Sequence, residues 1–186
     1  EQYPAIRIRV VDESVNQMLS SVISGEADFG IGFMSTQVPE VAFEPIHDDP
    51  FVLAMPRSHA LAGRKAIRWA ELGAERLISV ARSSGNRQLQ DDALAKAGVN
   101  PSFAFEVSHV ATLLGMVEAG LGLAAVPRMA LPRQHATLVG VALRDPPIVR
   151  KLGLLTRHGA SLRPAAEAFH RHLRDALKSP KPFDML

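Results

Sequence analysis

The sequence predicts an α/β protein in which helices flank a mixed, mainly parallel sheet. Short apolar runs of the length of buried strands recur along the chain. Between them lie segments whose apolar residues recur every three or four positions, as on the buried face of a helix. A strand, a helix and a second strand in succession form the unit of a parallel sheet. With 186 residues, 47% of them apolar, the chain can form one large domain or two smaller lobes.

The first two elements are expected within residues 6–25. Residues 6–11 begin with alternating apolar and charged side chains, which predicts a strand with one partly solvated face. The helix that follows has its apolar residues on one stripe, formed by Val15, Met18, Leu19, Val22 and Ile23. Ser14 and Gln17 have the spacing of a capping box at its start, and Gly25 suits the left-handed turn that ends it.

Mostly extended structure is expected in the next part of the chain. Residues 27–33 form an apolar run typical of a strand buried on both faces, with glycines where another group must approach the backbone. Residues 43–55 predict an extended segment that is broken at 47–50. A single helical turn at 69–72 is expected before another buried strand at 77–80.

The second half of the chain repeats the same order of elements. Further strands are expected over residues 102–107, 121–127 and 149–156. The helices that precede the first two of these strands end at Gly98 and Gly120, and a last helix begins near Pro164, a residue suited to the first helical position. Residues 178–186 form a polar tail that is expected to fray.

Composition excludes several classes of function. The 21 Lys and Arg against 19 Asp and Glu leave a net charge of +2, too small for the footprint of a duplex-binding surface. Cysteine is absent, which excludes disulfides, thiolate metal sites and cysteine nucleophiles, and which fits a reducing cytoplasm. The sequence has neither the apolar run of about 20 residues that a membrane span needs nor a signal-peptide pattern at its start. We therefore expect no membrane association.

Three expected helices begin directly after a strand and beside a serine. The serines are Ser14, Ser83 or Ser84, and Ser108. In a parallel sheet, the carboxyl ends of the strands and the amino ends of the helices meet at one edge, where ligands bind. Backbone N–H groups, the positive end of the helix dipole and a hydroxyl suit an anion such as a carboxylate. The alternative interpretation is that each serine only caps its helix.

Neighbouring residues extend this candidate site. Phe33 and Met34 follow a strand and are candidates to line a pocket together with His109. Core packing is the alternative for Phe33, and surface variability is the alternative for Met34. Arg82 and Arg87 lie near the second serine pair and favour a small carboxylate as the ligand.

Metal binding and catalysis are not expected. Residues 47–49 combine one histidine with two aspartates in an expected turn, and His170 and His172 point to opposite sides of a helix, so neither set has ligand spacing. Ser84, His109 and Asp49 can be combined into a hydrolase triad, but the Gly-x-Ser-x-Gly motif that would support it is absent. The glycine spacing of a phosphate-binding loop is also missing near residue 85. We expect neither a metal nor a cofactor.

Three motifs, in the same order, resemble LysR-type transcriptional regulators. Residues 24–32 (SGEADFGIG) are similar to a segment that the family writes as gly-x-leu-asp-leu-ala-ile. Residues 52–61 resemble its val-pro-x-x-his-pro-leu strand. Residues 117–127 (VEAGLGLAAVP) resemble its val-x-x-gly-x-gly-ile-x-x-leu-pro segment, which is the most specific match. The similarity covers almost the whole chain, up to about Leu177.

The resemblance implies a periplasmic-binding-protein-like fold, in which two α/β lobes are joined by two crossover strands and a small effector lies in the cleft between them. It assigns residues 1–76 and 150–186 to the first lobe and residues 77–149 to the second. The family's effector contacts map onto the residues chosen above from helix-cap chemistry. They are Ser14, Val15, Gly32, Phe33, Met34, Ser83, Ser84, Ser108 and His109.

The chain departs from the family at its start. The winged helix-turn-helix domain is absent from this sequence, so DNA would be contacted only through a domain outside it. Tyr3 and Pro4 resemble the end of the family's first regulatory helix, which implies that the first lobe lacks its first strand. We expect a small-molecule effector and self-association as a dimer or tetramer. A solute-binding protein of a transport system is the alternative, and an enzyme on the same fold ranks third. A helix-turn-helix upstream would support the regulator, and a signal peptide would support the solute-binding protein.

Overall fold

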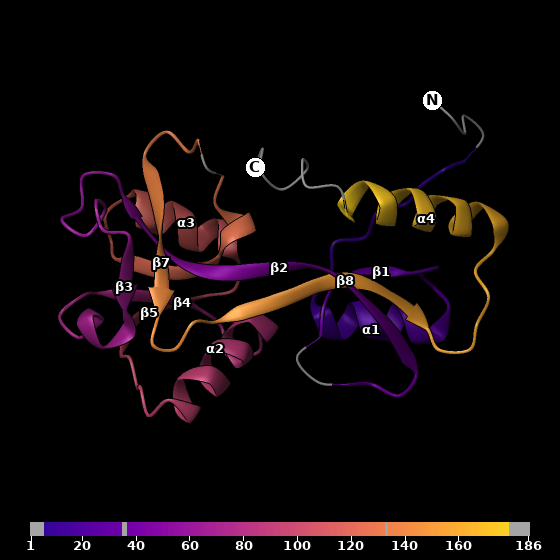
Figure 1. The fold of residues 1–186 in the computed structure, drawn as a ribbon, viewed down its shortest axis with the longest axis horizontal. Coiled ribbons are helices and arrows are strands. Elements are labelled where there is room, and N and C mark those ends of the chain that lie inside the picture. The colour runs from indigo at the N-terminus through magenta and orange to yellow at the C-terminus, as the bar shows by residue number, and fades with distance from the viewer. Residues whose placement is uncertain (1–5, 35–36, 133, 179–186) are drawn as a thin grey trace. The chain divides into compact units, whose positions relative to one another are not determined.

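The computed structural model describes residues 6–34, 37–132 and 134–178 (Figure 1). Its helices are α1 (Val15–Ser24), α2 (Gly85–Lys96), α3 (Val110–Glu118) and α4 (Pro164–Lys178), with short 3-10 turns η1 (Trp69–Leu72) and η2 (Arg128–Ala130). Its strands are β1 (Gly30–Phe33), β2 (Val41–Pro56), β3 (Ala66–Arg68), β4 (Leu77–Val80), β5 (Phe103–Val107), β6 (Leu123–Pro127), β7 (Leu138–Arg144) and β8 (Val149–Arg157). The alternation of strands and helices expected from the sequence is present.

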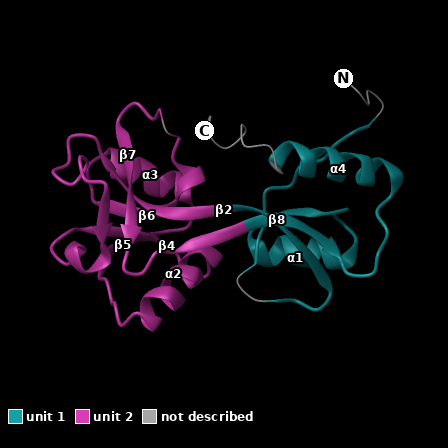
Figure 2. Ribbon diagram, viewed as in Figure 1, with its two compact units in different colours: residues 1–47, 152–180 teal, residues 48–151, 181–186 magenta. Residues whose placement is uncertain are grey.

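The described chain divides into two compact units (Figure 2). Unit 1 holds residues 6–47 and 152–178, and unit 2 holds residues 48–151. Strands β2 and β8 each belong partly to one unit and partly to the other, as the crossover strands of the expected fold would. The division differs from the sequence-based lobes because residues 48–76 fall in unit 2. The reason is that the second half of β2 pairs with β6 and β7, which belong to that unit.

Unit 1 contains α1, β1, α4, residues 41–47 of β2 and residues 152–157 of β8. Strand β1 pairs antiparallel with β8, with Gly30 opposite Leu155. The glycines of β1 make room for the chain's own helix, because a Cβ on Gly32 would lie 2.8 Å from Cε of Met18 in α1. Ile31 on the same strand is 55% exposed, so the expectation of a strand buried on both faces was wrong. The glycines of this apolar run therefore mark the one face of β1 that packs against α1, whereas Ile31 on the other face is exposed.

Residues 6–11 do not form the strand that their alternation predicted. They are assigned to no helix or strand, and Ile8, Val10 and Val11 are all more than half exposed. The alternation of side chains selects a face, but a strand also needs a neighbour for its N–H and C=O groups. No other strand of the described residues pairs with this segment. Tyr3, Pro4 and the tail from residue 179 lie outside the described residues.

Unit 2 is built on a mixed sheet. Its strand order is β2-β6-β4-β5, with β7 beside β2 and β3 beside β7. Strand β4 runs parallel to both β5 and β6, and β3 runs parallel to β7. Strand β2 runs antiparallel to both β6 and β7. Of the five pairings just named, three are parallel and two are antiparallel, so the sheet is mixed as the sequence analysis expected, although the short strands β3 and β7 were not foreseen.

Strand β2 is continuous where a break at residues 47–50 was expected. Polar residues near a proline suggested a solvated turn, but Asp49 is completely buried. Its carboxylate accepts hydrogen bonds from the Met129 N–H and from the Arg150 guanidinium. Because these partners replace water, a buried aspartate can remain within the strand.

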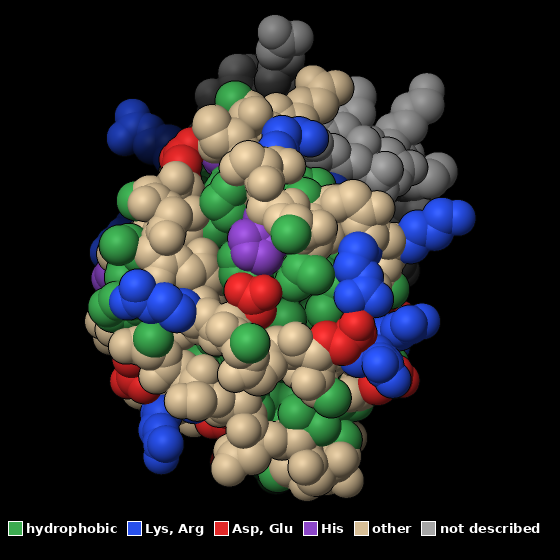
Figure 3. Space-filling view, turned by 90° about the vertical axis from the view of Figure 1, so that its left-hand side faces the viewer, with side chains coloured by type: hydrophobic (Ala, Val, Ile, Leu, Met, Phe, Trp, Pro, Cys, Tyr) green, Lys and Arg blue, Asp and Glu red, His purple; other side chains and the backbone are tan. Residues whose placement is uncertain are grey.

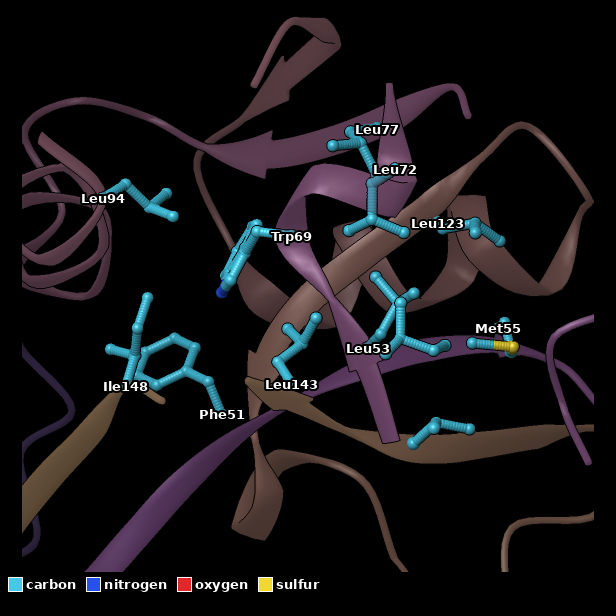
Figure 4. Close-up of a cluster of buried hydrophobic side chains, with 12 residues drawn as sticks. Phe51, Leu53, Met55, Trp69, Leu72, Leu77, Leu94, Leu123, Leu143 and Ile148 are labelled. Carbon is cyan, nitrogen blue, oxygen red and sulfur yellow. The ribbon is translucent and has the colours of Figure 1, made fainter. Parts of the chain in front are cut away.

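The core of unit 2 lies on both faces of its sheet. Successive residues of β2 point to opposite faces, so Phe51, Leu53 and Met55 join one cluster while Val52 and Ala54 join the other. Figure 4 shows the first cluster, in which Trp69 packs among leucines from several strands. Helix α2 contributes to this cluster, and α3 covers the second one. The two helices are thereby held with their amino ends at the sheet edge described next.

Candidate functional site

Helices α2 and α3 begin at the same edge of the unit 2 sheet. Strand β4 leads into α2 and β5 leads into α3, and the two strands are parallel neighbours with Val80 opposite Val107. The Ala81 N–H donates to the Val107 carbonyl at 2.8 Å, which ties the two strand ends together. The sequence-based argument from parallel strands therefore holds in this unit. It brings Ser83, Ser84, Ser108 and His109 to one edge.

The amino end of α2 leaves hydrogen-bonding groups unused. Ser84 is the N-cap, yet its hydroxyl makes no capping hydrogen bond. Its carbonyl accepts from the N–H groups of Arg87 and Gln88, both at 3.0 Å. Within the described residues, no hydrogen bond engages the N–H groups of Gly85 and Asn86, which are the first of the helix. A hydroxyl and two N–H groups at the positive end of a helix can receive an anion.

The side chain of Arg87 anchors the first turn of α2 through buried contacts. Its side chain is 7% exposed, and it donates to Asp91 at 2.7 Å and to the Ser79 hydroxyl at 2.9 Å. The guanidinium also lies 4.3 Å from the ring centroid of Phe103. These contacts occupy Arg87 within the fold, so of the two arginines named from the sequence only the exposed Arg82 is left for a ligand.

A second set of side-chain contacts links the start of α2 to strands β2 and β8, a link that the sequence analysis did not predict. Arg150 of β8 donates to the Asn86 side-chain carbonyl at 3.1 Å and is paired with Asp49 of β2 at 2.8 Å. These residues are far apart in the chain, and none belongs to a recognisable motif. No sequence signal could have brought them together.

The start of α3 differs from its prediction by one residue. The N-cap is His109, with φ −123° and ψ 140°, and not Ser108. The His109 side chain makes no capping hydrogen bond. Ser108 precedes the cap and is exposed, as is His109. The strand ends at Val107 as expected, but the first helical residue is Val110, so the residue before it, His109, takes the N-cap position.

In unit 1, the candidate residues are engaged by the fold to different extents. Ser14 forms the predicted capping box, accepting from the Gln17 N–H at 3.4 Å and donating to its side-chain oxygen at 2.8 Å. Phe33 is 6% exposed and serves the core, which was its alternative interpretation. Val15 and Met34 are half-buried, and Gly32 packs against α1. The Ser14 hydroxyl is thus already used, whereas that of Ser84 is not.

The structure offers no support for the metal and hydrolase alternatives. In the described part of the chain, no group of three His, Asp or Glu side chains is placed to hold a metal ion. The ring of His170 packs edge-on against Phe29 at 5.1 Å, and burial lowers the pKa of His170. Asp49 is paired with Arg150, so it does not orient a histidine as a triad aspartate would.

Two surface hollows lie away from the predicted residues. One, of about 270 Å³, is in unit 1 and is lined by Asp28 and Arg163, which pair at 2.8 Å. The other, of about 350 Å³, is in unit 2 and is lined by His59 and Glu75, whose side chains are 3.6 Å apart. The charged groups of each hollow therefore face each other, which leaves less of their charge for a ligand.

Basic side chains do not form an extended patch on the face of the molecule shown in Figure 3. Lys and Arg lie there singly or in small groups, with acidic and hydrophobic side chains between them. This agrees with the net charge of +2. None of the helices in the described ranges is both long and apolar enough to cross a membrane.

Comparison with known proteins identifies the family to which this chain belongs. A family model described as the LysR substrate binding domain matches residues 1–178, and the chain belongs to this family. It is 40% identical over 170 residues to the uncharacterized HTH-type transcriptional regulator YbhD of Escherichia coli (strain K12), a match covering 91% of this chain and 54% of that protein. It is 26% identical over 179 residues to the DNA-binding transcriptional dual regulator OxyR of the same strain, covering 94% and 58%. The chain spans about half the length of the curated relatives it matches.

Solved structures agree on the fold. The regulatory domain of CcmR from Synechocystis PCC6803 in complex with 2-PG has a TM-score of 0.86 at 21% identity, covering 96% of this chain and 87% of that one. The reduced form of OxyR has a TM-score of 0.75 at 25% identity, covering 96% and 84%. The effector binding domain of QuiR in complex with shikimate has a TM-score of 0.78 at 19% identity, covering 89% and 79%. The chain therefore has the periplasmic-binding-protein-like fold of LysR effector-binding domains.

Proposed function

We propose that this chain senses a small, carboxylate-bearing metabolite and that the ligand controls DNA binding and transcription by the regulator of which it forms the effector-binding part. The unused donors at the start of α2 carry this proposal. Ser84 has a hydroxyl without a capping bond, and the N–H groups of Gly85 and Asn86 are unpaired in the described chain. A ligand carboxylate would satisfy groups that the fold leaves open.

The relatives support a binding function over catalysis. Their names describe transcriptional regulators, and the solved neighbours include domains bound to shikimate and to 2-PG. A solute-binding protein of a transport system is not favoured, because the family and its matched relatives are regulators. We infer that DNA is contacted by a helix-turn-helix domain outside these residues, that the protein self-associates and that it acts in the cytoplasm.

The remaining candidate contacts are proposed in two groups. In unit 2, we propose contacts from Ser83, Ser108 and His109, which lie at the same sheet edge as Ser84 and are exposed at the surface. In unit 1, we propose contacts from the first turn of α1, beginning at Val15, and from Met34. The Ser14 hydroxyl and Phe33 are weaker candidates because capping and core packing already occupy them.

A metabolite screen followed by serine substitutions tests the proposal. Small carboxylates are first screened by thermal shift, since a ligand at 100 times its Kd stabilises a protein by about 2.7 kcal/mol. Ser84→Ala and Ser108→Ala should each weaken binding of the metabolite found by about 0.5–3 kcal/mol, measured by calorimetry, because each removes a hydroxyl facing the ligand.

The matched control is Ser102→Ala, which removes an exposed hydroxyl elsewhere in unit 2. It should leave affinity unchanged. Unaltered affinity in both Ser84→Ala and Ser108→Ala would remove these serines from the effector site.

A further inference from the structure

We propose that the ion pair between Asp49 and Arg150 is a positioning device that couples the amino end of α2 to strands β2 and β8. The inference deepens the proposed function in one respect, since it takes the start of α2 as part of the effector site. It assigns to two residues outside any recognised motif the task of passing a change at that site to the rest of the chain.

One carboxylate and one guanidinium join four segments of unit 2. Both Nε and Nη2 of Arg150 lie 2.8 Å from Oδ2 of Asp49. The third nitrogen, Nη1, donates to Oδ1 of Asn86 in the first turn of α2 at 3.1 Å. The other oxygen of Asp49 accepts from the Met129 N–H at 3.0 Å. A displacement of Asn86 therefore pulls on a guanidinium that is also bound to Asp49 of β2, and through Asp49 it reaches η2.

Burial makes this connection stiff. Asp49 is 0% exposed, and the Arg150 side chain is 15% exposed. The planar guanidinium fork restricts the geometry in which it can satisfy both partners, and low solvent access strengthens each bond. The neighbouring pair Asp48–Lys151 is different, because both side chains are 64% exposed. An exposed pair of this kind contributes little and is screened by salt.

The ion pair lies where strands β2 and β8 pass from unit 2 into unit 1, which suits it to transmit a change at α2. In the stretch 48–151 that forms the described part of unit 2, Asp49 is the second residue and Arg150 is the second-last. Strands β2 and β8 continue from these residues into unit 1. A ligand that tightens or displaces the first turn of α2 thus acts on the chain at the two points where it leaves unit 2. This is a contiguous network of the sort through which coupling between sites travels.

The test is a mutant cycle read out by hydrogen exchange in the intact protein without any effector. The reporters are the Met129 amide, which is bonded to Asp49, and the Phe51 amide, which is bonded to the Ile148 carbonyl at 2.8 Å. Asn86→Ala removes the link at the α2 end and should speed exchange of both amides about two- to tenfold. The same substitution should have no further effect in an Asp49→Asn/Arg150→Gln background, where the ionic link is already absent.

Two matched controls separate coupling from general loosening. Gln88→Ala alters an exposed residue of the same helix turn, whose side chain makes no hydrogen bond in the described chain, and it should leave both rates unchanged. Asp48→Asn/Lys151→Gln removes the adjacent exposed pair and should not abolish the response to Asn86→Ala. If the double variant of the buried pair does not fold, Arg150→Lys serves as the background, because it keeps the charge and loses the fork.

The proposal is overturned if Asn86→Ala leaves both amides at the wild-type rate, or if its effect is the same size in the background that lacks the ionic link. Neither result depends on a ligand. Failure of the effector site would instead appear as unchanged affinity in the serine variants, so the two failures are distinguishable.

Discussion

Ser14 and Ser84 occupy the same position at the start of different helices, and their hydroxyls have different uses. The Ser14 hydroxyl is bound within a capping box by Gln17, whereas Ser84 has no acceptor or donor for its hydroxyl within α2. The difference arises at the third helical residue, which is Gln17 in α1 and Arg87 in α2. The Arg87 side chain instead donates to Ser79 and Asp91, so it cannot complete a capping box with Ser84. At the scale of single residues, this favours Ser84 over Ser14 as a ligand contact.

Glu71 provides a pH-dependent prediction at the same scale. The Arg68 N–H and the Arg64 guanidinium donate to its carboxylate at 2.8 and 2.7 Å, and these bonds lower the pKa of Glu71 from 4.5 to about 2. A carboxyl with a lowered pKa stabilises the folded state above its unfolded pKa, and the contribution is lost as the pH falls toward the folded value. The wild type should therefore lose its stability advantage over Glu71→Gln as the pH falls from about 4.5 to about 2.

Urea unfolding at a series of pH values measures this difference. Arg64→Gln serves as the comparison, because it removes one of the two main causes of the shift and should narrow the pH window. A constant difference between wild type and Glu71→Gln across this range would contradict the interpretation.

At the scale of elements, two glycines differ in the space around them, and so we expect opposite effects on stability when each is replaced by alanine. A Cβ on Gly122, just before β6, would lie 2.4 Å from the Arg76 carbonyl oxygen, and backbone cannot easily move aside. Gly122→Ala should destabilise the fold by about 1–3 kcal/mol. A Cβ on Gly115 within α3 would meet nothing within 4 Å, so Gly115→Ala should stabilise by about 0.5–1 kcal/mol.

Thermal or urea unfolding of the two variants checks both signs at once. Gly63→Ala, at another position with open space, controls for the general effect of removing a glycine. Equal stability of the Gly122→Ala variant and the wild type would show that this segment relaxes at no cost.

Strand β2 shows why the elements were only partly foreseeable. The sequence around residues 47–50 has the composition of a turn, but partners more than 75 residues away along the chain satisfy Asp49. The opposite error occurred at residues 6–11, where a strand-like pattern found no pairing strand in the described chain. In both cases local preference was overruled by hydrogen-bond partners that local sequence does not contain.

At the scale of the whole molecule, the buried apolar residues are distributed unequally. Both hydrophobic clusters belong to unit 2, and the buried apolar residues of unit 1 are Val22, Phe33, Val41, Leu154 and Leu155. Because burial is the main source of stability, unit 1 should open more readily than unit 2. Native-state hydrogen exchange should show faster exchange for β1 than for β6.

The comparison is made at a protein concentration where the oligomeric state is known, since association would protect exposed strands. The control strand is β4, which is buried throughout and should match β6. Equal protection of β1 and β6 would mean that the two units unfold as one.

The sequence by itself determined the fold family, the alternation of strands and helices, the capping box of α1 and the sheet edge at which α2 and α3 begin. These features depend on short-range periodicity and on motifs within a few residues, so they can be seen in the chain alone. Only the tertiary structure decided that β2 is continuous, that residues 6–11 form no strand, that His109 takes the N-cap position of α3 and that Arg150 joins Asp49 to Asn86. The physical reason is that burial and hydrogen-bond pairing are satisfied between segments far apart in the chain, and no local pattern records which partner will be supplied.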